Sequence, residues 1–78
     1  MTEMKADVVL DAKGLHCPMP VLKTRKAIDG MQKGQTLEVN ATDPASKNDI
    51  PALLERLGHE LVHTDEKEGV FTYIIKKR

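Results

Sequence analysis

The sequence predicts an α/β protein, a βαβαββ two-layer α/β sandwich in which two helices cover one face of a four-stranded mixed sheet. Apolar residues recur at helical spacing in two segments, which predicts two helices. In four shorter segments they alternate with polar residues or form a continuous run, which predicts four strands. The two β-α-β crossovers imply parallel strands, and the final hairpin implies an antiparallel one. We expect residues 1–78 to form a single domain, because the chain is short and contains no linker or repeat.

The first strand is predicted over 7–11, where an apolar run is bounded by aspartates. After a short loop, the first helix is expected over about 18–32, with Gly30 and Gly34 bracketing its end and Gly34 as the better stop signal. Its inner stripe is Val21, Thr24, Ile28 and Met31. Cys17 is then the expected N-cap, and Pro18 takes the first helical position, where a missing N–H is no loss.

Residues 35–41 alternate between apolar and polar, which predicts a half-buried strand. The second helix is expected to start between Ser46 and Asp49, which resemble a weak capping box, and to end at Gly58. A start this late keeps Pro51 near the first turn. Two further strands, 60–65 and 70–76, are joined by a turn over 66–69. The predicted core includes Leu37, Val39, Ile50, Leu53, Leu54 and Leu57.

Charge is balanced overall but unevenly spread. Twelve Lys and Arg residues equal twelve Asp and Glu residues. The stretch 13–33 carries Lys13, Lys23, Arg25, Lys26 and Lys33 against Asp29 alone, whereas the stretch 34–68 is mainly acidic. The basic stretch is either a solvated helix face or a docking surface for an acidic partner.

Several classes of protein are disfavoured. No apolar run approaches the ~18 residues of a membrane span, and charged residues interrupt the N-terminus, so we expect a cytoplasmic protein without membrane insertion. A single cysteine agrees with a reducing compartment. Zero net charge and only two aromatic residues argue against direct nucleic-acid binding.

Cys17 is the only cysteine, and it follows a strand in the loop that enters a helix. Ligands bind at that edge of open α/β sheets, and a helix N-terminus favours a thiolate. The helix dipole is worth roughly 0.3–1 kcal/mol, less than the ~1.36 kcal/mol of one pKa unit. Amide groups or the ammonium groups of Lys13, Lys23 and Lys26 would have to contribute the rest of a large shift.

Elimination favours a carrier of a sulfur-bound group. A thiol–disulfide oxidoreductase needs a second cysteine, and a cysteine hydrolase needs a substrate pocket for which 78 residues leave little room. A metal site needs three or four ligands; His59 and His63 are interpreted as ordinary surface or edge residues, and His16 as a candidate for proton transfer. We expect no metal and no cofactor.

The run from Leu10 to Val21 resembles the signature of the TusA/SirA-type sulfur-carrier family, L-D-x-x-G-L-x-C-P-x-P. The segments Asp43-Pro44-Ala45 and Asp49-Ile50-Pro51 resemble the second block of that family. The resemblance spans nearly the whole chain. It implies a βαβαββ sandwich with sheet order 1-2-4-3 and an antiparallel last strand.

The resemblance also implies a sulfurtransferase that holds sulfane sulfur as a persulfide on Cys17, supported by Gly14, Pro18 and Pro20. Sulfur would come from a cysteine desulfurase or a rhodanese. It would pass to an acceptor protein in tRNA thiolation, molybdenum-cofactor biosynthesis or sulfur oxidation. Several tRNA-thiolation members carry an acidic residue where this chain has Met19, which leaves the partner open. We expect a monomer whose candidate docking residues are Lys13, His16, Met19, Lys23, Arg25 and Lys26.

Two other hypotheses remain open. The basic tail 76–78 and similar RNA-binding folds suggest a non-catalytic RNA- or protein-binding regulatory module. Cys17 is alternatively a redox-sensing thiol that dimerises. Intact mass after incubation with a sulfur donor separates the three: a carrier gains one sulfur, a sensor forms a dimer or an oxygen adduct, and a binding module does neither.

Overall fold

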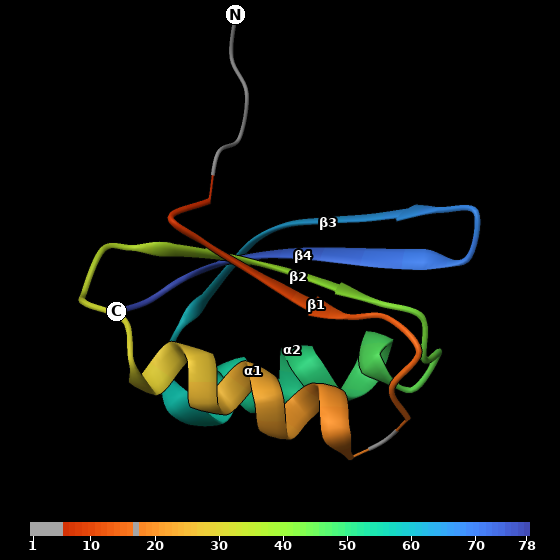
Figure 1. The fold of residues 1–78 in the computed structure, drawn as a ribbon. Coiled ribbons are helices and arrows are strands. Elements are labelled where there is room, and N and C mark those ends of the chain that lie inside the picture. The colour runs from red at the N-terminus through yellow and green to blue at the C-terminus, as the bar shows by residue number, and fades with distance from the viewer. Residues whose placement is uncertain (1–5, 17) are drawn as a thin grey trace, which may run out of the picture.

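The computed structural model describes residues 6–16 and 18–78, and its elements follow the predicted order. Both helices lie on one face of the sheet, and no helix or strand of the described residues covers the opposite face (Figure 1). The elements are β1 (Val8–Ala12), α1 (Met19–Asp29), β2 (Thr36–Ala41), α2 (Ser46–Leu57), β3 (Glu60–Lys67) and β4 (Val70–Lys76).

The sheet has the strand order β1-β2-β4-β3. β1 runs parallel to β2, and β4 is antiparallel to both of its neighbours, β2 and β3. This confirms the predicted fold class and the strand order that the family resemblance implied. Ala12 pairs with Ala41 at the ends of β1 and β2, so the loops that lead into the two helices leave the same edge of the sheet.

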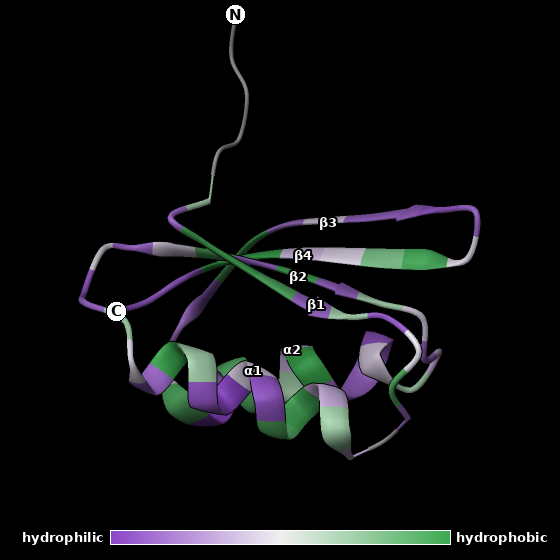
Figure 2. Ribbon diagram, in the orientation of Figure 1, coloured by the Kyte–Doolittle hydropathy of each residue, from purple (hydrophilic) through white to green (hydrophobic). Residues whose placement is uncertain are grey.

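The core lies between the sheet and the helices. Side chains alternate along each strand, so the apolar side chains of one face point toward the helices (Figure 2). Its buried members are Ala12, Ile28, Met31, Leu37, Val39, Ala41, Ile50, Leu54, Phe71, Tyr73 and Ile75. Leu53 is also buried, as predicted. The prediction for Leu57 was wrong: it is the last residue of α2, and 36% of it is exposed, so it lies on the rim of the core.

The uncovered face of the sheet is largely polar. Thr72 Oγ1 donates to Asn40 Oδ1 at 2.8 Å, and Asn40 Nδ2 donates to Glu38 Oε2 at 2.9 Å. The first of these hydrogen bonds joins β4 to β2 and the second lies within β2, and polar side chains of this kind are usual on the open face of a sheet with antiparallel strands.

α1 is shorter at both ends than predicted. Its N-cap is Pro18, not Cys17, because the Pro18 carbonyl already accepts the Leu22 N–H at 3.0 Å while its backbone, at φ −96° and ψ 13°, is not yet helical. At the other end, α1 stops at Gly30 rather than Gly34. Lys77 Nζ donates to the carbonyls of Ile28 and Met31, each at 2.7 Å, which places its ammonium group against the C-terminal end of α1.

α2 begins at the early end of the predicted range, with Ala45 as its N-cap. The expected capping box does not form. Ser46 is instead the first helical residue, and its buried hydroxyl is hydrogen-bonded to the Tyr73 hydroxyl at 2.8 Å. Because of this early start, Pro51 lies inside the helix rather than in its first turn. Gly58 ends the helix in the left-handed conformation, as predicted.

The hairpin between β3 and β4 is tighter than predicted. β3 continues to Lys67, and the turn consists of Glu68 and Gly69, at φ 51° and 80°. Two consecutive positive φ values are the signature of a turn that matches the twist of the flanking strands. β3 is an edge strand with a register shift between Leu61 and His63 and a mostly exposed surface.

Candidate functional site

The motif loop is the segment 13–18, which links β1 to α1; Cys17 lies outside the described residues. Local hydrogen bonds shape its first half: the Lys13 N–H donates to Asp11 Oδ1 at 3.0 Å, and the Leu15 N–H donates to the Ala12 carbonyl at 3.3 Å. Gly14 has φ +81°, a conformation that disfavours a side chain. The side chain of Leu15 is half-buried against the core.

The second half of the motif loop leads directly into α1. The Met19 N–H donates to the His16 carbonyl at 2.8 Å, which holds the residues on either side of Cys17 and Pro18 together. Pro20 is fully buried, and its carbonyl accepts a hydrogen bond from Thr24 Oγ1 at 2.7 Å. Pro18 and Met19 are exposed. The two prolines of the motif therefore occupy different environments, one at the surface and one in the interior.

A groove of about 310 Å³ lies between α1 and α2, beside the start of α1. Pro18 lines it directly, so the groove is next to the position of Cys17 in the chain. The other lining residues are Val21, Asp49, Ala52, Leu53 and Arg56. Sequence reasoning placed no α2 residue near the site, although Leu53 lies at the edge of the predicted α2 stripe.

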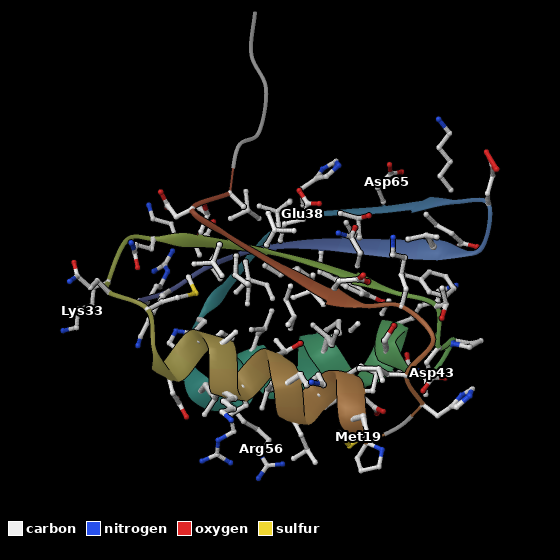
Figure 3. All side chains as sticks on the ribbon, viewed as in Figure 1. Met19, Lys33, Glu38, Asp43, Arg56 and Asp65 are labelled. Atoms are coloured by element: carbon white, nitrogen blue, oxygen red, sulfur yellow. The ribbon has the colours of Figure 1, made fainter. Side chains whose placement is uncertain are left out.

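Charged residues of both signs occur in the helix layer and in the sheet: the helices carry Asp29, Glu55 and Arg56, and the strands carry Glu38, Asp65 and Lys76. Met19 and Arg56 lie on the outer side of the helix layer, whereas Glu38 and Asp65 lie on the uncovered side of the sheet (Figure 3). Lys33 is at the end of α1 away from Met19 (Figure 3). The first turn of α1 holds no acidic residue, and none of the described side chains caps it.

The basic residues predicted for docking are spread along α1 rather than gathered at its start. Lys23, Arg25 and Lys26 are exposed, as is Lys13 in the motif loop. Lys26 lies in the last turn, about 10 Å along the helix axis from Met19 at ~1.5 Å per residue. This exceeds the ~8 Å screening length of physiological salt. Lys26 is therefore placed to steer a partner, and its backbone lies farther from the start of α1 than that of Lys23.

A second groove of about 310 Å³ lies between the first half of α2 and the β3–β4 hairpin. None of the motif residues that the structure describes lines this second groove. Lys47 Nζ lies 3.7 Å from Glu66 Oε1 across this groove and 5.4 Å from the centre of the Phe71 ring. Lys47, the basic residue that lines this groove, is thus already paired with an acidic residue of the same molecule.

Metal ligands do not gather anywhere in residues 6–16 and 18–78: no three His, Asp or Glu side chains there lie close enough to share an ion. His59 Nδ1 accepts the Arg78 N–H at 3.0 Å, and His63 is exposed on the edge strand β3. Within the same residues, no helix is long and apolar enough to cross a membrane.

Comparison with known proteins agrees with the sequence signature. The family model described as sulfurtransferase TusA matches residues 8–77. The chain is 44% identical to sulfur carrier protein TusA of Pseudomonas putida (strain GB-1), an alignment that covers 100% of this chain and 98% of that protein. It is 45% identical to sulfur carrier protein TusA of Allochromatium vinosum, over 91% of this chain and 93% of that one.

A solved structure supports the same assignment. The crystal structure of a SirA-like protein from Desulfitobacterium hafniense matches with a TM-score of 0.78 at 27% sequence identity. The match covers 88% of this chain and 95% of the other. Sequence and fold agree over almost the full length, and the chain therefore belongs to the TusA sulfurtransferase family.

Proposed function

We propose that this protein carries sulfane sulfur as a persulfide on Cys17 and relays it between two partner proteins. The observation that carries the proposal is the position of the lone cysteine. It directly precedes Pro18, in the loop that leaves the edge where β1 and β2 both end. In a member of the TusA family, that is the one thiol available to hold sulfur. We further propose that the chain acts as a single-domain monomer in the cytoplasm, where a lone thiol stays reduced.

Sulfur loading needs little machinery in the carrier. The Cys17 thiolate attacks the outer sulfur of a persulfide on a donor enzyme, such as a cysteine desulfurase or a rhodanese. A sulfur–sulfur bond forms to Cys17 as the donor's own sulfur–sulfur bond breaks, and the donor leaves as a thiolate. One sulfur atom moves with no net oxidation or reduction. Delivery repeats the exchange, with a thiolate of the acceptor as the attacking group.

The surroundings of the motif loop suit brief encounters with two partners. His16, Pro18 and Met19 are exposed, and the groove between α1 and α2 opens beside them. A partner side chain can seat in this groove while the basic residues of α1 attract an acidic surface. Buried Pro20 anchors the start of α1 in the core, which restrains the helix end next to the groove.

The structure disfavours the RNA-binding alternative. Bases stack on exposed aromatic rings, and the chain has only Phe71 and Tyr73. Both lie in the core, at 7% and 3% exposure. Neither residue is exposed enough to offer a ring face on which a base could stack.

Intact mass spectrometry tests the proposal. After incubation with a cysteine desulfurase and cysteine, or with thiosulfate and a rhodanese, the wild type should gain one sulfur atom that a reductant removes. Cys17→Ser should gain none, and His16→Ala, which changes the exposed neighbour and keeps the thiol, should still gain it. A gain that persists in Cys17→Ser would refute the proposal. A disulfide-linked dimer or an oxygen adduct instead of the sulfur adduct would favour the redox sensor.

A further inference from the structure

Thr42 ties the motif loop to a different part of the chain. The Gly14 N–H donates to Thr42 Oγ1 at 2.9 Å, across 28 positions of sequence. Thr42 directly follows β2, and Ala41 before it pairs with Ala12 at the end of β1. The threonine is exposed, so its hydroxyl is not needed to satisfy a buried group.

Among the described residues, the other hydrogen bonds in the first half of the motif loop are local. Those from Lys13 to Asp11 and from Leu15 to Ala12 shape a turn, but they do not hold that turn against the second β-α loop. Gly14 has φ +81°, and glycine has the greatest conformational freedom of any residue, so the backbone at this position gains most from a restraint. The bond to Thr42 restrains this point, three residues before Cys17.

We propose that Thr42 is a positioning residue for sulfur transfer: its hydroxyl restrains Gly14 and thereby sets the direction in which the motif loop presents Cys17 to a docked partner. This inference rests on the proposed role of Cys17. Exchange at a sulfur–sulfur bond needs a defined line of approach, and small misplacements of a reacting group slow such a reaction. Loss of one exposed hydrogen bond should slow transfer about three- to tenfold.

The test compares Thr42→Val, which removes the hydrogen-bonding oxygen but keeps the shape, with Thr42→Ser, which keeps the hydroxyl. Thr64→Val is the matched control, because Thr64 is an exposed threonine on the edge strand β3. Sulfur loading is followed in a single turnover over a range of donor concentrations. The donor is whichever of a persulfidated cysteine desulfurase and a rhodanese loads the wild type.

We expect the saturated rate of Thr42→Val to fall about three- to tenfold while the half-saturating donor concentration stays unchanged. Thr42→Ser and Thr64→Val should match the wild type. A saturated rate in Thr42→Val equal to the wild-type rate, or a change in half-saturation alone, would overturn the inference.

Hydrogen exchange of the Gly14 amide provides a test that needs no variant. This amide should exchange slowly in the wild type, and an unprotected amide would also overturn the inference. Failure of the wild type to load from either donor, or loading of Cys17→Ser, would refute the proposed function and this inference with it. Those two results come from proteins with Thr42 intact, so they are distinct from a failure of the Thr42 inference alone.

Discussion

Lys77 closes the C-terminal end of α1 from the far end of the chain, and replacing it with methionine should destabilise the fold. Its ammonium group donates two hydrogen bonds of 2.7 Å, to the carbonyls of Ile28 and Met31. Hydrogen bonds to a charged group contribute about 1.5–3 kcal/mol when buried, and a cation near a helix C-terminus adds about 0.3–1 kcal/mol. Lys77 is only half-buried, so water can hydrogen-bond to the two carbonyls when the ammonium group is removed and recover part of this free energy. We therefore expect a loss of about 2 kcal/mol in the free energy of unfolding.

Urea denaturation followed by circular dichroism measures this loss. A domain of this size has a total stability of about 4–12 kcal/mol, so a change of about 2 kcal/mol is readily resolved. Lys33→Met is the matched control, because Lys33 is an exposed lysine in the turn after α1. Lys77→Arg should retain much of the stability, since it keeps the charge and the donors. A loss below about 0.5 kcal/mol in Lys77→Met, or an equal loss in Lys33→Met, would refute the reasoning.

Three further predictions follow from burial, surface charge and titration. Leu54→Ala should cost about 2–5 kcal/mol in chemical denaturation, while Leu57→Ala, on the rim, should cost less than about 1 kcal/mol; equal costs would contradict the assignment of the core. Charge reversal at Lys23 and Lys26 should slow association with a sulfur donor about tenfold at low salt and much less at high salt in single-turnover transfer. Equal rates of wild type and variant at both salt concentrations would show that docking uses another surface. Burial raises the pKa of Tyr73, partly offset by its hydrogen bond to Ser46, so the folded state favours the neutral phenol. This contribution to stability is complete below a pH of about 10 and is lost as pH rises through the raised pKa. Tyr73→Phe should therefore reduce the loss of unfolding free energy at alkaline pH. An unchanged dependence of the unfolding free energy on pH would exclude Tyr73 as the cause of that loss.

Local patterns in the sequence determined the order and type of every element. The alternation of Leu37, Val39 and Ala41 predicted which face of β2 is buried, because successive side chains of a strand point to opposite faces. Gly58 predicted the end of α2, because a residue without Cβ adopts the left-handed conformation freely. The motif around Cys17 predicted the family, and with it the sheet order. All of these signals act over a few neighbouring residues.

Only the tertiary structure decided where contacts between distant segments override those local signals. Lys77, just beyond the last strand, binds the carbonyls of Ile28 and Met31 where α1 ends, and no pattern within 18–32 predicts that contact. Ser46 does not cap α2 as predicted. Its hydroxyl is instead hydrogen-bonded to the buried Tyr73 hydroxyl, which comes from β4. The pairing of Gly14 with Thr42 and the groove between α1 and α2 likewise exist only once β1 and β2 end at the same edge. The sequence predicted the reactive residue, and packing between segments far apart in the chain built the described surface beside it.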